Sequence, residues 1–115
     1  MDKNCLFCKI IKGEIKAKIA YENEKVFAFY DINPQAPTHV LIIPKLHISG
    51  APEIDDNNRT VVSDLIIAAN EIARQSGIDK TGYRLVLNCG PDAGQAVFHL
   101  HLHLLGGRKL NWPPG

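Results

Sequence analysis

Three histidines alternate with leucine in one short stretch of the chain, at His99, His101 and His103. Side chains of a β-strand point to opposite faces in turn, so a strand over His99–Leu105 carries the three imidazoles on one face. The other face carries apolar side chains for a core: Leu100, Leu102 and Leu104. Three of the five histidines of the chain fall within five residues, which a merely solvated face would not need. The pattern therefore indicates chemistry on the imidazole face.

Two kinds of chemistry fit three neighbouring imidazoles. They can hold a catalytic zinc ion, or one of them can attack a phosphate while its neighbours orient it and move protons. Same-face neighbours on a strand lie roughly 6.5–7 Å apart, so three rings spread over about 13 Å. That spread is too wide for three ligands of one ion, whose nitrogens lie about 2.0–2.1 Å from the metal. The spacing favours a nucleophile, with the middle histidine, His101, flanked on both sides.

The composition is that of an ordinary globular domain. The chain has 115 residues, 45% of them apolar and 22% charged, with a net charge of +1. The length predicts a single domain, 1–115, and the absence of a basic run argues against a nucleic acid polymer as partner. The longest apolar runs are too short to span a bilayer, so no membrane partner is expected. Because the segment 1–4 lacks a signal peptide's apolar stretch and the three cysteines are an odd number, we expect a cytoplasmic protein, with the nucleus as a second location.

The elements that must position the histidines read as an α+β domain, with one long helix covering a face of a five-stranded antiparallel sheet. The strands are expected at 19–22, 25–31, 38–44, 83–88 and 99–105, and the helices at 5–12 and 57–76. An apolar stripe at helical spacing runs along the long helix, and Gly77 is placed to be its C-cap. The strand at 38–44 is nearly all apolar, which predicts a central position in the sheet.

The sequence Cys5-Leu-Phe-Cys8 is a second motif with chemical potential. It could be a redox pair, although its flanks do not look like a thioredoxin motif. It could equally be two ordinary apolar cysteines, or half of a zinc site that two histidines complete. Cys89 has no evident partner and is expected to be a small core residue.

The stretch 99–105 resembles the motif of the histidine triad (HIT) family, and further blocks of that family follow in the right order. These blocks lie at Phe7–Ile11, Asp31–His39, Ile43–Ser49, Gly94–Gln95 and Leu105–Arg108. The ending Asn111–Gly115 resembles the nucleotide-binding (Hint) branch. The resemblance implies a HIT-like fold and hydrolysis of purine nucleoside 5′-phosphoramidates and related nucleotides (AMP or GMP type) at the α-phosphate, through a covalent nucleotidyl-histidine. The alternatives are a dinucleoside polyphosphate hydrolase, against which the Trp-Pro-Pro-Gly ending argues, and a non-catalytic nucleotide- or zinc-binding protein.

The resemblance also assigns roles to the histidines. His101 resembles the nucleophile, and the carbonyl of His99 would hold its other ring N–H. His103 would contact the phosphate or the leaving group, and His39 resembles a fourth active-site histidine on the neighbouring strand. The family further implies a homodimer, with the long helix and the strand at 83–88 near the two-fold axis and Trp112 near the partner's active site.

Other residues are implied as substrate contacts. Asn88, Gln95 and the backbone N–H of Ala96 would face the phosphate or leaving group, and Asp31 would accept from the ribose hydroxyls. The base would be walled by five apolar residues: Leu6, Phe7, Ile10, Phe29 and Ile32. Ala96 is a departure, because many members of the Hint branch have a serine there that is thought to help the leaving amine. Its loss puts the preference for phosphoramidates in doubt.

The same resemblance favours a zinc ion at the Cys-x-x-Cys motif. Zinc-bearing branches of the family are similar to this chain in both cysteines and in two histidine positions, which implies the set Cys5, Cys8, His47 and His99. Four protein ligands leave no open position, so the ion would be structural. It would pin the short N-terminal helix, and no organic cofactor is expected.

Overall fold

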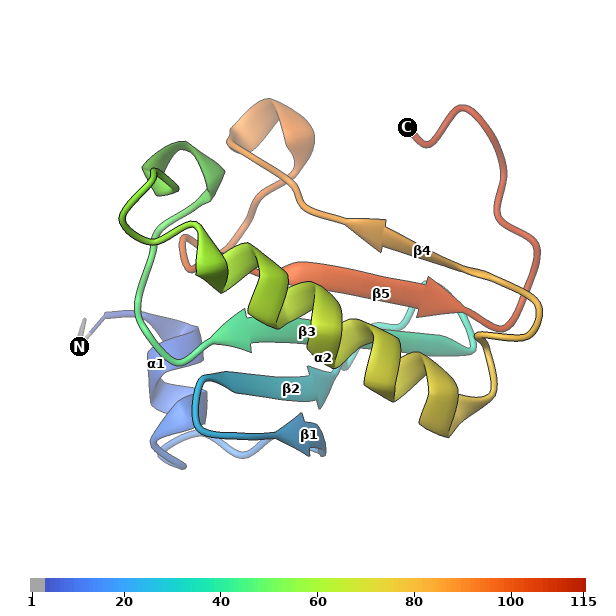
Figure 1. Ribbon diagram of the computed structural model, residues 1–115, viewed down its shortest axis with the longest axis horizontal. Coiled ribbons are helices and arrows are strands. Elements are labelled where there is room, and N and C mark those ends of the chain that lie inside the picture. The colour runs from blue at the N-terminus through green and yellow to red at the C-terminus, as the bar shows by residue number, and fades with distance from the viewer. Residues whose placement is uncertain (1–3) are drawn as a thin grey trace.

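The computed structural model of the protein describes residues 4–115 and contains a five-stranded antiparallel sheet with helices on its faces (Figure 1). The strands are β1 (Ile19–Glu22), β2 (Val26–Tyr30), β3 (Thr38–Pro44), β4 (Tyr83–Val86) and β5 (Leu102–Gly106). The helices are α1 (Leu6–Ile11) and α2 (Thr60–Ser76), with short 3-10 turns η1 (Ala51–Glu53) and η2 (Pro91–Ala93). The expected α+β architecture is thus confirmed. Residues 1–3, on which the expectation about a signal peptide rests in part, lie outside the described residues.

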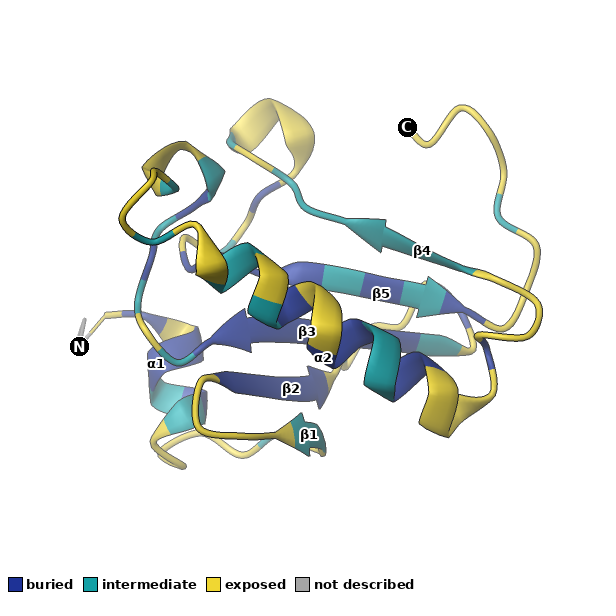
Figure 2. Cartoon of the chain, viewed as in Figure 1, coloured by how far each residue is buried: buried dark blue, intermediate teal, exposed yellow. Residues whose placement is uncertain are grey.

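The strand order β1-β2-β3-β5-β4 places β3 at the centre of the sheet, as its apolar sequence predicts. Side chains of β3 alternate between two apolar clusters because successive residues of a strand face opposite sides. Val40 and Ile42 pack with α2, whereas Leu41 and Ile43 pack with α1. The strands β2 and β3 are accordingly buried along almost their whole length (Figure 2). The histidines of β3 and β5 share the α1 side of the sheet.

Helix α2 covers the other face through its small-residue stripe. Its buried positions are Leu65, Ala68, Ala69, Ile72 and Ala73. Alanines let the helix backbone approach the sheet closely, while burial of Leu65 contributes about 1.5–3 kcal/mol. Gly77 caps the helix in the left-handed conformation, as expected. Neither this helix nor any other within residues 4–115 is long and apolar enough to cross a membrane.

Two predicted element boundaries are wrong by three residues. Helix α2 begins at Thr60 rather than at Asn57. The cause is that Asn58 Oδ1 accepts from the Asp55 N–H at 2.8 Å, and Asp55 Oδ1 accepts from the Asn57 N–H at 2.8 Å, which builds a turn before the helix. Strand β5 begins at Leu102 rather than at His99. Elsewhere the predicted ends of helices and strands agree with the structure to within two residues.

Strand β5 continues backwards into an irregular segment that still keeps the alternating burial. Leu100, Leu102 and Leu104 are all buried in the α2-side core, as predicted. The Leu100 N–H donates to the Ile48 carbonyl at 2.6 Å instead of joining the ladder with β3. His99 and His101 therefore precede the ladder, and the β3–β5 pairing begins where Leu102 lies opposite Ile42.

The turn after β5 is tightly fitted against the loop that leads into β3. Gly107 has a φ of +94°, and a Cβ built there would lie 2.9 Å from the Cβ of Pro37. A side chain at this position therefore meets both backbone strain and a steric clash.

We expect Gly107→Ala to lower the free energy of unfolding by about 2–5 kcal/mol, the sum of left-handed strain and overpacking. Gly13→Ala is the matched control, because Gly13 has a φ of +81° with nothing within 4 Å of its built Cβ. The control should lose about 1–2 kcal/mol, from strain alone. Chemical denaturation of both variants measures the difference, and equal losses would contradict the close approach of Pro37.

Candidate functional site

Three of the predicted active-site histidines lie together on the α1 side of the sheet. His39 stands on β3 and His103 on β5, and His39 Nε2 lies 3.0 Å from His103 Nδ1. The rings of His101 and His103 are 5.1 Å apart between centroids. His39 and His101 are buried, and His103 is half-buried. The predicted cluster of His39, His101 and His103 therefore exists in the folded chain.

The hydrogen bonds of His101 decide which of its nitrogens can react. Nδ1 lies 2.7 Å from the carbonyl oxygen of His99. A carbonyl can only accept, so Nδ1 carries the hydrogen and neutral His101 keeps a lone pair on Nε2. Phe7 packs edge-on against the ring, with centroids 5.2 Å apart, and restricts its orientation. This arrangement leaves Nε2 of His101 with a free lone pair, on the other side of the ring from the main-chain contact.

The His39–His103 pair has an equally definite order of hydrogens. The backbone N–H of Gln35 donates to His39 Nδ1 at 3.1 Å, so neutral His39 carries its hydrogen on Nε2. That hydrogen is donated to His103 Nδ1, which leaves neutral His103 with a hydrogen on its own Nε2. Asp31 Oδ2 lies 3.5 Å from His39 Nε2 and supports positive charge on the pair. His103 is thereby prepared as a donor.

Burial keeps the pair neutral near pH 7. It lowers the pKa of His103 to about 4, an effect that the neighbouring His101 and His39 increase and Asp31 opposes. Burial also lowers the pKa of His39, again against the attraction of Asp31. Both rings therefore take part as hydrogen-bonding neutral imidazoles.

A second cluster joins the Cys-x-x-Cys motif to two histidines, Cys5, Cys8, His47 and His99. Its ligand atoms are close: Cys5 Sγ and Cys8 Sγ lie 3.3 Å and 3.6 Å from His99 Nδ1. Nδ1 of His47 lies 3.4 Å from Cys8 Sγ and 3.1 Å from His99 Nδ1. A tetrahedral zinc ion, with bonds of about 2.3 Å to sulfur and about 2.0–2.1 Å to nitrogen, separates its ligand atoms by about 3.3–3.8 Å. The four distances above, 3.1–3.6 Å, lie close to the edges of such a tetrahedron, and all four atoms lie within 4.8 Å of one another.

Outer contacts of this cluster also suit a metal. His99 Nε2 lies 2.8 Å from the Pro44 carbonyl and so carries the hydrogen, which leaves the Nδ1 lone pair facing the thiols. Metal-binding histidines commonly hold their other N–H against a carbonyl in this way. Cys5 is the N-cap of α1 and accepts from the Cys8 N–H at 3.2 Å, so both sulfurs are presented at the start of one helix.

The histidine pair of the other cluster is a poor metal site by the same test. Asp31, His39 and His103 also place possible ligand atoms within 4.8 Å of one another. However, the Gln35 N–H occupies the Nδ1 lone pair of His39, so its Nε2 carries a hydrogen and has no lone pair for an ion. We therefore interpret this group as a hydrogen-bond relay and the cysteine–histidine group as the metal site candidate.

The structure places the predicted base-wall residues in two environments. Phe7, Ile10 and Phe29 are buried in the α1-side cluster, and the rings of Phe7 and Phe29 meet edge-on with centroids 5.4 Å apart. Leu6 and Ile32 are exposed, Ile32 fully so. The buried aromatic floor and the two exposed side chains lie on elements that adjoin the histidine cluster.

The predicted phosphate contacts are placed less uniformly. Asn88 is half-buried two residues beyond β4, and Ala96 is exposed in the loop before His99. Gln95 is buried, and its amide is already engaged: Oε1 accepts from the Gly90 N–H at 2.9 Å, and Nε2 donates to the carbonyls of Ser49 at 2.8 Å and Val97 at 3.2 Å. In this structure Gln95 ties the segment between β4 and β5 to the loop after β3, and it would have to exchange a partner to reach a phosphate.

The expectation that Cys89 is a small core residue is wrong, and Trp112 lies apart from the histidines within one protomer. Cys89 is exposed rather than part of the core, because β4 ends at Val86 and the chain leaves the sheet there. Trp112 is exposed in the C-terminal tail, where its ring lies 5.9 Å from the guanidinium carbon of Arg84 on β4. Within one protomer, Trp112 belongs with β4, on the other side of β5 from His39.

Sequence reasoning missed three main-chain groups that organise the site. The Pro44 carbonyl orients His99, the Gln35 N–H selects the tautomer of His39, and the Ile48 carbonyl holds Leu100. Main-chain groups are common to all residues, so no side-chain pattern could have identified them.

Comparison with known proteins agrees with this geometry. The HIT domain family model matches residues 12–110, which is most of the chain. The protein belongs to the HIT family. A protein of Zea mays named 14 kDa zinc-binding protein is 49% identical over 116 residues, covering 99% of this chain and 90% of its own length. A HIT-like protein of Synechococcus elongatus is 47% identical over 115 residues, covering 100% of each chain.

Solved structures of HIT proteins are also similar to this chain. A HIT family hydrolase from Legionella pneumophila superposes with a TM-score of 0.95 at 50% identity, covering 97% of this chain and 100% of that one. A HIT family hydrolase from Clostridium thermocellum does so with a TM-score of 0.94 at 54% identity, covering 96% of each. The fold of this HIT protein is thus shared along essentially its whole length.

The low pKa of His103 predicts a pH dependence of stability. Between the ordinary pKa of 6.5 and the folded pKa of about 4, the unfolded chain binds a proton that the folded chain does not. The stabilisation of the folded chain that His103 contributes is therefore complete above pH 6.5, and it is lost as the pH falls towards 4. His103→Gln removes it and should flatten the slope by up to about 1.4 kcal/mol per pH unit. Denaturation curves from pH 7.5 down to about pH 4.5 measure the slopes, and parallel curves for the two proteins would contradict a buried neutral His103.

Proposed function

We propose that this HIT protein hydrolyses purine nucleoside 5′-phosphoramidates and related nucleotides at the α-phosphate, with His101 as the nucleophile. The observation that carries the proposal is the hydrogen bond from His101 Nδ1 to the His99 carbonyl, at 2.7 Å, which leaves a lone pair on Nε2. Hydrolase relatives of the same fold support the reaction class. Nucleotidyl transfer to a histidine also explains why the chain places several neutral imidazoles together.

In the first half of the reaction, a bond forms between Nε2 of His101 and the α-phosphorus while the phosphorus–nitrogen bond of the substrate breaks. The ring becomes cationic at that moment, because its Nδ1 hydrogen remains in place. A charged N–H donates more strongly than a neutral one, so the His99 carbonyl stabilises the intermediate more than the free enzyme. Water then attacks the phosphorus, and the His101 lone pair is restored.

The relay of His39 and His103 supplies a hydrogen bond to the reacting groups. His39 donates to His103 Nδ1, so the Nε2 hydrogen of His103 is available to a phosphoryl oxygen or to the departing amine. The departing amine takes the proton it needs from solvent water, because transfer from the neutral pair would leave an imidazolate anion beside the Asp31 carboxylate, and the water that attacks in the second half releases one proton in turn. Ala96 has no hydroxyl to donate to the leaving group, so we expect the Nε2–H of His103 to make that hydrogen bond.

Mutation of the nucleophile tests the proposal. His101→Asn should lower turnover of adenosine and guanosine phosphoramidates by at least about a thousandfold, because the covalent step is lost. Binding of AMP, measured by calorimetry, should change by no more than about threefold, because binding is spread over the pocket. Cys89→Ser, an exposed site, is the control for handling and should keep full activity.

A panel that includes diadenosine polyphosphates distinguishes the alternatives. Faster turnover of diadenosine polyphosphates than of phosphoramidates would favour the dinucleoside polyphosphate hydrolase. Tight AMP binding with no turnover of any substrate would favour the non-catalytic nucleotide-binding protein. More than a tenth of wild-type turnover in His101→Asn would contradict the covalent mechanism.

We also propose that Cys5, Cys8, His47 and His99 hold a structural zinc ion. The support is the tetrahedral spacing of the four ligand atoms, the Pro44 carbonyl behind His99, and the zinc-binding relative from Zea mays. When bound, the ion supplies a rigid link between α1 and the segment before β5. The thiolates need a reducing compartment, which supports our proposal of a cytoplasmic location.

Metal analysis of the purified protein tests this site. About one zinc per chain is expected, and His47→Asn or Cys5→Ser should reduce it to less than about a tenth, because a lost ligand opens the tetrahedron. Cys89→Ser should keep full zinc content. Less than a tenth of an equivalent in wild-type protein that never met a chelator would contradict the site.

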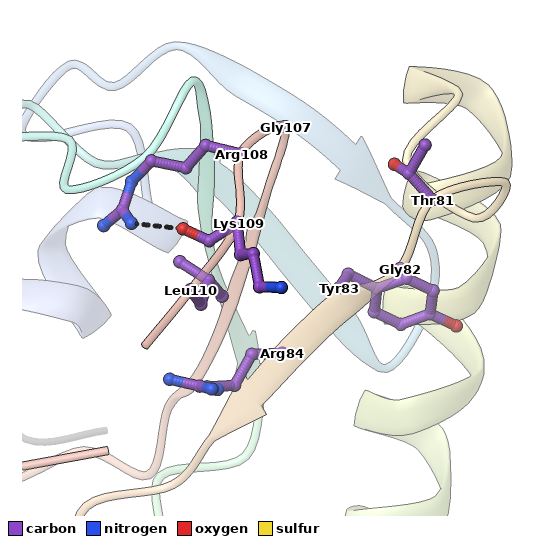
Figure 3. Close-up of a pocket in the computed structure, with 8 residues that line it drawn as sticks. All are labelled: Thr81, Gly82, Tyr83, Arg84, Gly107, Arg108, Lys109 and Leu110. Atoms are coloured by element: carbon purple, nitrogen blue, oxygen red, sulfur yellow. Dashed lines mark hydrogen bonds between the residues drawn. The ribbon is translucent and has the colours of Figure 1, made fainter. Parts of the chain in front are cut away.

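A homodimer through β4 and α2 is the assembly we propose. Strand β4 is the last strand of the sheet order, and Ile66 of α2 is 39% exposed. Ile66 lies one helical turn from Asn70, whose side chain bonds Tyr83 of β4 at 2.6 Å, so Ile66 faces the β4 side. A cavity of about 610 Å³ separates Thr81–Arg84 from the tail at Gly107–Leu110 (Figure 3). A second copy placed along β4 would cover these surfaces and bring Trp112 towards the partner.

Light scattering tests the assembly with a matched pair of variants. Wild-type protein should be a dimer at micromolar concentration. Ile66→Asp should weaken the dimerisation affinity by at least about tenfold, because the substitution would bury an unpaired charge at the interface. Ile67→Asp is the control, because Ile67 is 63% exposed and borders a hollow beside the β1–β2 turn instead. A monomeric wild type, or equal effects of the two substitutions, would contradict the interface.

A further inference from the structure

The segment that carries the nucleophile is held by few main-chain contacts. His99 and His101 lie before the start of β5, outside the regular β3–β5 pairing. Between them, the Leu100 N–H donates to the Ile48 carbonyl at 2.6 Å. The sheet alone therefore does not fix the orientation of the peptide at His99, whose carbonyl decides the tautomer of His101.

The side chain of His99 supplies the missing constraint. Its Nε2 donates to the Pro44 carbonyl at 2.8 Å, and its Nδ1 faces the two thiols and His47 at 3.1–3.6 Å. The ring is fully buried, so it has little freedom once both nitrogens are engaged. A ring fixed at both nitrogens also fixes the main chain to which it is attached.

We propose that the Cys5–Cys8–His47–His99 centre positions the nucleophile: metal coordination through His99 Nδ1 fixes the His99 carbonyl, and this carbonyl holds His101 in its reactive tautomer. His99 is thus a positioning residue, which acts on the phosphorus only through His101. The inference rests on the proposed zinc site and makes metal occupancy a determinant of nucleophile competence.

The proposed path consists of two short links. From the ligand atoms it runs through the His99 ring to the carbonyl, and from the carbonyl oxygen to His101 Nδ1 over 2.7 Å. Phe7 of α1 supports both links, because its ring packs edge-on against His99 at 6.0 Å and against His101 at 5.2 Å between centroids. Cys5, the N-cap of α1, and Cys8, within the helix, lie on either side of Phe7 in the sequence, so metal coordination also fixes the position of the Phe7 ring.

Loss of the metal removes these constraints from the His99 carbonyl. If the His99 carbonyl turns away, the hydrogen of neutral His101 is free to move from Nδ1 to Nε2. An Nε2 that carries a hydrogen has no lone pair for the phosphorus, so the fraction of competent enzyme falls. The nucleotide pocket as a whole need not change, which separates this effect from a loss of binding.

Nitrogen NMR of histidine-labelled protein tests the inference directly. In the zinc-loaded protein, His101 should show a protonated Nδ1 and an unprotonated Nε2. After chelation, or in His47→Asn, the Nε2-protonated form of His101 should rise from a minor form to about nine-tenths or more of the neutral ring, and zinc should restore the chelated protein but not the variant. His39 is the internal control, since the Gln35 N–H fixes its tautomer independently of the cluster. Cys89→Ser should behave as wild type.

Replacement of zinc by cadmium covers the case in which metal-free protein fails to fold. The larger ion should shift the nitrogen NMR signals of the His101 ring, while those of the His39 ring stay unchanged. Unchanged His101 signals in folded protein after metal removal or exchange would overturn the inference while leaving the zinc site standing. A protein that takes up no metal would overturn both.

Kinetics on the same samples connects the tautomer to function. Metal-free protein that remains folded should lose at least about tenfold in the rate of the covalent step, with less than about threefold change in AMP affinity. A metal-dependent His101 tautomer in a protein with no turnover would leave this inference intact and overturn the hydrolase proposal instead. Full activity without metal would overturn the inference.

Discussion

The hydrogen bond from His101 Nδ1 to the His99 carbonyl is the interaction on which the proposed reactivity of this protein depends. At 2.7 Å it assigns the hydrogen to Nδ1 and leaves the lone pair on Nε2, without help from a charged partner. A carboxylate in this place would hold the same tautomer but would have to be buried at a large desolvation cost. A main-chain carbonyl carries no such cost, but its direction depends entirely on how the backbone at His99 is held.

The two faces of the sheet have separate roles in holding the backbone at His99. Alternation along β3 sends Val40 and Ile42 to the α2 core, where close packing with alanines makes a rigid support. The opposite face collects the histidines of β3 and β5 together with α1 and its cysteines. Apolar burial on that face keeps the imidazoles neutral, as the lowered pKa values of His39 and His103 indicate. The same burial that stabilises the fold therefore sets the protonation state in which the histidines can work.

Much of this arrangement could be predicted from the sequence, because it follows from periodicity. Alternation of leucine with histidine predicted the buried face of Leu100, Leu102 and Leu104, and apolarity predicted the central strand. Periodicity failed at His99, since the chain there leaves the ladder to bond Ile48 while the leucine pattern continues unbroken. It also failed at Asn57 and Cys89, where side-chain-capped turns and an early strand end decide the structure. The main-chain partners Pro44 and Gln35 have no sequence signal at all, so only the fold could reveal them.

The stereochemical course at phosphorus tests the covalent mechanism most directly. A nucleoside phosphoramidate made chiral at phosphorus with oxygen isotopes is hydrolysed in isotopically labelled water, and the configuration of the product is measured. Attack by His101 followed by attack of water comprises two displacements, each with inversion, so we expect net retention of configuration. Net inversion would show that water attacks the phosphorus in one step, and it would contradict the role of His101 as a covalent nucleophile.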